Sequence, residues 1–210
     1  MALSGVSNDA SVTSLPDTSG FPSRSALSNV GTIRYKASAS EINGRSALFL
    51  DGSAALDASD SGSTYTRRTL VMVFYSNCCC GTPVYYLWDL RDDWGGAYFY
   101  SRSSAGGGAG PFDSSSRTWI NGAVATSSNT PNLCNAISSG GKAKVLIWEG
   151  SNSNHGNDVT LFARYTFGEK MGHVWLGEFQ IYDRVLDDSA RVALECGLAS
   201  KWGISISGCI

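Results

Sequence analysis

The feature that most constrains this chain is a series of short apolar runs, each separated from the next by Gly, Ser, Asn and Asp. Eight such runs follow Arg45, and each spans four to nine residues. They cover 47–50, 69–75, 84–89, 97–100, 118–125, 143–148, 159–165 and 174–182. Many short strands joined by turns are typical of antiparallel sandwiches and barrels. The pattern predicts an all-β fold.

Three of these runs carry more detail. Asn121-Gly122 lies between apolar residues, and Asn-Gly is the strongest local signal for a two-residue hairpin turn. The run 69–75 is apolar at nearly every position, which indicates a central strand covered on both faces. In 178–182, Phe179 and Ile181 alternate with polar residues, so we expect them on one face of a strand.

One stretch predicts a helix, from Asp188 to about Trp202. Asp187 or Asp188 can cap its first turn, and Gly203 ends it. The expected buried stripe is Ala190, Leu194, Leu198 and Trp202. The chain up to Arg45 is predicted to be loop-like, with an irregular segment over 1–16, and the tail 205–210 gives no prediction.

Length and charge set limits on domains and partners. The 210 residues, 42% of them hydrophobic, fit one domain over 1–210 with a full core. Sixteen Lys and Arg against eighteen Asp and Glu give a net charge of -2, so nucleic acid is a poor candidate for a partner. No apolar run approaches the ~20 residues of a membrane span, and no secretory signal is visible in this chain.

The six cysteines leave their state open. They are Cys78, Cys79, Cys80, Cys134, Cys196 and Cys209. An even number allows disulfides, but the sequence alone neither selects a pairing nor excludes free thiols. Zinc is disfavoured because there is no Cys-x-x-Cys pair and both histidines lie far from any cysteine in sequence.

Several segments, taken in order, resemble a known family. They are 17–20, 48–52 with 55–56, 119–122, 175–186 and 198–204. Together they are similar to laminin G-like, or concanavalin A-like, jelly-roll domains. The resemblance implies an antiparallel jelly-roll β-sandwich that commonly binds glycans or proteins, sometimes through calcium. The chain departs from the family pattern at Gln180, where an acidic residue is frequent, and in the inserted Cys78–Cys80 run.

The matching residues have structural roles in this interpretation. Asp51-Gly52 turns the chain after a strand, Asn121-Gly122 forms a hairpin, and the segment with Trp175 and Gly177 is a strand leading to the closing helix. The other tryptophans, apart from Trp94, are likewise expected in the core rather than on a binding platform. Family binding residues lie in variable loops, so none is transferred to this chain.

No catalytic constellation is evident, and we expect no enzyme activity. Glucanases of this fold carry paired carboxylates on one strand, roughly Glu-x-Asp-x-x-Glu, and no glutamate here has an Asp two positions later. There is no Gly-x-Ser-x-Gly motif, and a serine triad would have to use His155 or His173. A hydrolase that uses one of these histidines stays the third hypothesis.

Two loops are candidates for ligand binding. Asp92 and Asp93 offer oxygen ligands for calcium or acceptors for sugar hydroxyls, and Trp94 offers an aromatic face for a pyranose ring. The alternative is a solvated hairpin loop with Trp94 packed on the core. Asn152 and Asn154 could bind sugar hydroxyls, or they could satisfy their own backbone. Apart from calcium at Asp92 and Asp93, no cofactor is expected.

These observations favour a non-catalytic binding or adhesion module. Its ligand would be a glycan or a protein partner on an extracellular, particle or virion surface. The alternative is a structural subunit of a multi-chain assembly without a small-ligand site, to which the low charge and the Ser- and Gly-rich loops are suited.

Overall fold

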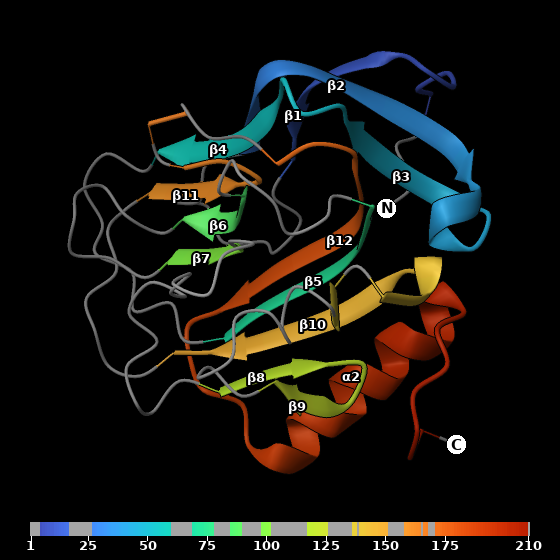
Figure 1. The fold of residues 1–210 in the computed structure, drawn as a ribbon, viewed down its shortest axis with the longest axis vertical. Coiled ribbons are helices and arrows are strands. Elements are labelled where there is room, and N and C mark those ends of the chain that lie inside the picture. The colour runs from blue at the N-terminus through green and yellow to red at the C-terminus, as the bar shows by residue number, and fades with distance from the viewer. Residues whose placement is uncertain are drawn as a thin grey trace.

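The computed structural model describes residues 5–16, 27–59, 69–77, 85–89, 98–101, 117–125, 136–137, 139–150, 158–164, 166–167 and 171–209. This part of the chain is almost entirely β-strand, with one C-terminal helix (Figure 1). The strands are β1 (Ser11–Leu15), β2 (Leu27–Ala39), β3 (Arg45–Leu50), β4 (Ala55–Ser59), β5 (Thr69–Ser76), β6 (Tyr85–Asp89), β7 (Tyr98–Ser101), β8 (Arg117–Ile120), β9 (Ala123–Ala125), β10 (Lys144–Glu149), β11 (Asp158–Leu161) and β12 (Val174–Tyr182). Two 3-10 turns, η1 (Ser40–Ile42) and η2 (Ser139–Gly141), and helix α2 (Asp188–Trp202) complete the described elements. The all-β prediction is confirmed.

All the strands join one antiparallel sheet that curls on itself. The order is β7-β6-β11-β4-β2-β3-β12-β5-β10-β8-β9, with β1 paired to β2. Strand β2 divides the sheet into two halves, one with β7, β6, β11 and β4 and the other with β3, β12, β5, β10, β8 and β9. It belongs to both halves, because its first part pairs with β4 and its second part pairs with β3. Between them lies Gly31, where a Cβ would stand 2.4 Å from the Ser53 carbonyl oxygen. The strand therefore changes partner at a point where only glycine fits.

The curl encloses the main core. Leu56 and Leu161 from one half of the sheet lie in the same cluster as Leu48 and Leu146 from the other. Trp88 of β6 and Trp148 of β10 meet within this cluster, with ring centroids 5.9 Å apart. The two halves therefore pack face to face as the layers of a sandwich do.

A second core lies on the outer face of the β5 half of the sheet, under α2. Strand β5 contributes alternate residues to the two cores, with Met72 and Phe74 inside the curl and Val71 and Val73 beneath the helix. Figure 1 shows α2 beside β8, β9 and β10. The prediction that this strand is covered on both faces is confirmed, and α2 accounts for the outer cover.

Helix α2 begins and ends where the sequence predicts. The Asp187 carboxylate accepts a hydrogen bond from the Ala190 amide, and Gly203 closes the helix in the left-handed region. The predicted stripe is correct for Leu198 and Trp202, which are buried, and wrong for Ala190, which is exposed. Ala190 lies in the first turn, where the helix contacts the sheet through ion pairs and not through apolar side chains.

The Asn-Gly hairpin is confirmed between β8 and β9. Asn121 and Gly122 have φ angles of 48° and 80°, the conformation that this turn requires. The Asn121 side chain also accepts a hydrogen bond from the Val145 amide at 2.8 Å, which fixes the turn to β10. A Cβ on Gly122 would stand 2.8 Å from Ile206 in the C-terminal tail.

The expectation of loop-like structure up to Arg45 is wrong. Ser11–Leu15 within the segment 1–16 forms β1, and Leu27–Ala39 forms the longest strand of the sheet. In β2, buried Ile33 and Tyr35 alternate with exposed Thr32 and Arg34, which is the period of a half-buried strand. This alternation spans only a few residues, and the Ser, Asn and Gly residues around it are typical of turns, so the strand was not predicted from the sequence.

A disulfide joins Cys196 of α2 to Cys209 of the tail. It closes a short loop over the end of the helix and keeps Ile206 buried against the second core. Cys78, Cys79, Cys80 and Cys134 lie outside the described residues.

Candidate functional site

The predicted loop ligands cannot be placed. Asp92, Asp93 and Trp94, and with them the calcium prediction, lie outside the described residues, and so do Asn152 and Asn154. Within the described ranges, no group of three or more His, Cys, Asp or Glu side chains is arranged to hold a metal ion. No described helix is long and apolar enough to cross a membrane.

Asp51 and Gly52 form the turn after β3. The Asp51 carboxylate accepts hydrogen bonds from the amide and hydroxyl of Ser53 at 2.9 and 2.6 Å, and these bonds hold the pKa of Asp51 below its usual value. A Cβ on Gly52 would stand 2.9 Å from the Gly172 backbone, so this turn packs tightly against the segment that enters β12. The Asp51-Gly52 turn thus lies directly against the residues just before β12, the strand that pairs with β3.

A row of aromatic side chains crosses the outer face of the sheet. Phe49 of β3, Trp175 of β12 and Tyr75 of β5 are direct cross-strand neighbours. The Phe49 and Trp175 ring centroids are 4.7 Å apart, and those of Trp175 and Tyr75 are 5.4 Å apart. All three side chains are only partly buried. We call Phe49, Trp175 and Tyr75 the aromatic row.

The aromatic row lies beside the part of this face that α2 covers. Trp175 and Tyr75 pack against the second core. That core includes Val73, two residues before Tyr75 on β5, and Ala47, two residues before Phe49 on β3. Two residues after Trp175, Gly177 receives the Trp202 ring of the helix. The helix ends next to Gly177, with Gly203 as its C-terminal cap. The aromatic row is therefore the part of the apolar outer face that lies beyond the end of the helix.

Polar side chains border the aromatic row on the β2 side. Arg34, the cross-strand neighbour of Phe49, is exposed. The Lys36 ammonium stands 5.6 Å from the Phe49 ring centroid and forms an ion pair with Asp9. His173 is exposed, with its ring 6.1 Å from that of Phe49. Aromatic faces and hydrogen-bonding groups therefore share one surface.

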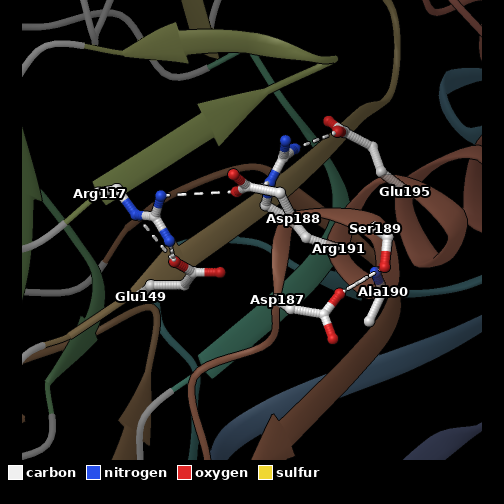
Figure 2. Close-up of polar contacts among 8 residues, drawn as sticks. All are labelled: Arg117, Glu149, Asp187, Asp188, Ser189, Ala190, Arg191 and Glu195. Carbon is white, nitrogen blue, oxygen red and sulfur yellow. Dashed lines mark hydrogen bonds and ion pairs between the residues drawn. The ribbon is translucent and has the colours of Figure 1, made fainter.

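A second polar cluster joins the ends of β8 and β10 to the first turns of α2 (Figure 2). Arg117 donates two hydrogen bonds to Glu149, at 2.7 and 3.1 Å, and its other terminal nitrogen lies 3.5 Å from Asp188. Arg191 pairs with Glu195, whose other oxygen accepts a bond from the Gly122 amide. The guanidinium carbons of Arg117 and Arg191 stand 5.0 and 4.3 Å from the Trp119 ring centroid.

This cluster is explained by docking of the helix. Burial raises the pKa values of Glu149 and Glu195 above the usual glutamate value, although arginines and the Gly122 amide oppose the shift. One oxygen of Glu149 is bound by Arg117, and both oxygens of Glu195 have partners. The two carboxylates thus connect α2 to the hairpin and to β10.

Sequence reasoning missed the aromatic row and both buried glutamates. Of the tryptophans expected in the core, Trp88, Trp119, Trp148 and Trp202 are buried, whereas Trp175 keeps part of its ring exposed. The signal for the row was available only in part: Phe49, Tyr75 and Trp175 each lie between two residues that the structure buries on the opposite face of the strand. Which strands are adjacent had to come from the structure.

Comparison with known proteins gives no relative. No protein-family model matches the chain, and no match was found among curated proteins or solved structures. The functional argument therefore depends on the geometry of the chain itself.

Proposed function

We propose that this protein is a non-catalytic binding module that recognises glycans through the aromatic row. The observation that carries the proposal is the line of three partly exposed rings on adjacent strands, with their centroids 4.7 and 5.4 Å apart. One face of a pyranose ring presents C–H groups, which pack on aromatic faces, while its hydroxyls need hydrogen-bonding partners at the edges. Arg34, Lys36 and His173 supply such partners.

Two further features support a binding role. The chain lacks the paired-carboxylate motif of glucanases. Among the described buried glutamates, Arg191 and the Gly122 amide bind both oxygens of Glu195, and Arg117 binds one oxygen of Glu149. We also propose membership of the laminin G-like group with its jelly-roll connectivity. The curled antiparallel sheet with a closing helix supports that assignment.

We also propose that the protein acts outside the reducing cytosol, on an extracellular or particle surface. The Cys196–Cys209 disulfide supports this location, because disulfides persist in oxidising surroundings and are rare where thiols are kept reduced.

The test is binding of the purified protein to a glycan array, followed by calorimetry on the sugars that bind. Trp175→Ala should weaken binding about tenfold or more, a loss of roughly 1.4 kcal/mol. The control is Val124→Ala, which shortens a 65% exposed apolar side chain on β9, away from the aromatic row. Thermal unfolding of each variant checks that the fold is retained.

Two results would contradict the proposal. One is the absence of binding to every class of sugar, and the other is unchanged affinity in Trp175→Ala. If sizing also showed a stable multi-chain particle at low micromolar concentration, the role would be that of a structural subunit.

A further inference from the structure

We propose that the aromatic row takes a single soluble glycan chain that carries carboxylate groups, laid across the strands with one carboxylate on Arg34. This inference rests on the proposed function and adds the chemical class and the physical form of the ligand. It follows from three features of the site: the ring planes, the state of the flanking charges and the direction of the row.

The ring planes exclude a flat ligand surface. The Phe49 and Trp175 rings are inclined by 40° to each other, and the Tyr75 and Trp175 rings by 56°. Rings that stack on a crystalline polysaccharide must share one plane, whereas neighbouring rings of this row are inclined to each other. Each can instead face a different sugar of one chain whose successive units are rotated.

The flanking charges leave one cation available. Lys36 is neutralised by its ion pair with Asp9, and the Asp51 carboxylate is occupied by Ser53. Among the described residues, Arg34 has a single long hydrogen bond, from its Nη1 to the Asp9 carbonyl oxygen at 3.5 Å; its charge also acts on the Asp9 carboxylate, which Lys36 holds by a hydrogen bond. Most of its guanidinium donors are therefore free, and that planar group matches a carboxylate with two parallel hydrogen bonds.

The direction of the row joins these two features. Arg34, Phe49, Trp175 and Tyr75 are successive cross-strand neighbours on β2, β3, β12 and β5. At ~4.8 Å between adjacent strands, the line is about 14 Å long, enough for several sugar units. A chain that follows it stacks on the rings and brings an acidic group to the β2 end.

The experiment compares four probes in calorimetry and pull-down: a polygalacturonate oligomer, a dextran sulfate oligomer that carries sulfate but no carboxylate, a neutral cellulose oligomer and microcrystalline cellulose. The carboxylated oligomer should bind about tenfold more tightly than the neutral one, and the crystalline material should not retain the protein. Arg34→Gln should remove the preference for the acidic oligomer, so that the variant binds the acidic and the neutral oligomers with equal affinity. The matched control is Arg184→Gln, which removes an exposed arginine beyond the opposite end of β12.

Each outcome decides between the two proposals. Equal binding of neutral and acidic oligomers, retention on crystalline cellulose, or an Arg184→Gln effect as large as that of Arg34→Gln overturns this inference. A preference for the sulfated oligomer over the carboxylated one also overturns it. In these cases the proposed function stands if Trp175→Ala still weakens binding about tenfold or more. If no probe binds, or if binding does not depend on Trp175, both proposals fail.

Discussion

At the scale of single residues, Gly177 decides how closely helix and sheet approach. It lies at a bulge in β12, where the pairing with β5 shifts register between Leu176 and Glu178. A Cβ on this residue would stand 2.8 Å from two atoms of the Trp202 ring, which is itself buried. The indole therefore lies directly on the strand backbone.

Gly177→Ala should destabilise the protein by about 1–3 kcal/mol, because the added methyl overpacks the contact with Trp202. Gly197 is a matched control: it lies within α2 and has nothing within 4 Å of a built Cβ. Gly197→Ala should instead stabilise by about 0.5–1 kcal/mol through helix propensity. Urea unfolding of both variants measures the difference, and equal effects would contradict the packing described here.

Some residues were predictable because their signal is local. Asn121, Gly122, Asp187 and Gly203 each act within a few positions of themselves, so turn and capping rules identify them. Glu195 was not predictable in this way. Its burial depends on the Gly122 amide, which is 73 residues away in sequence.

At the scale of elements, α2 is attached to the sheet through two glutamates, Glu178 and Glu195, whose pKa values are shifted in opposite directions. At its C-terminal end, Glu178 of β12 accepts hydrogen bonds from the Lys201 ammonium and the Trp202 indole at 2.7 and 2.8 Å. Burial alone would raise the pKa of Glu178, but these bonds and one from Gln180 hold the pKa below the usual value. In the middle of the helix, burial raises the pKa of Glu195.

Glu178→Gln should therefore destabilise the protein by about 1–3 kcal/mol at pH 7, where the wild-type carboxylate is ionised and bonded. The lowered pKa means that this stabilisation is present above the usual glutamate pKa of 4.5 and is lost as the pH falls through the folded value. The stability gap between variant and wild type should close in acid. Unfolding titrations between pH 7 and pH 3 measure it, and a gap that widens in acid would refute the assignment.

Glu195 provides the internal comparison. Its raised pKa means that its contribution is favourable below 4.5 and is lost as the pH rises through the folded value, which is the opposite sign.

Elements with a strong period, such as β12 and α2, were predicted with their correct ends. β1, β2 and β4 were missed because their apolar residues are few and lie among Ser, Asn, Asp and Gly residues.

At the scale of the whole molecule, the curl of the sheet brings distant segments together. Phe49, Tyr75 and Trp175 are spread over 127 residues of sequence, so the row forms only through contacts between segments that are far apart in the chain. The number and type of most strands could be predicted, but strand order and register could not, because both depend on packing across the whole sheet. For this reason the aromatic row emerged from the structure and the predicted sites were loops.

The most direct test of the account follows the six tryptophan indole N–H signals by NMR during titration with a sugar that binds. Trp175→Phe assigns the decisive signal. Binding on the aromatic row predicts that the Trp175 signal shifts to saturation, while the signals of the buried Trp88, Trp119, Trp148 and Trp202 stay in place. A Trp175 signal that does not move at saturation, with the shift confined to another tryptophan such as Trp94, would contradict the account.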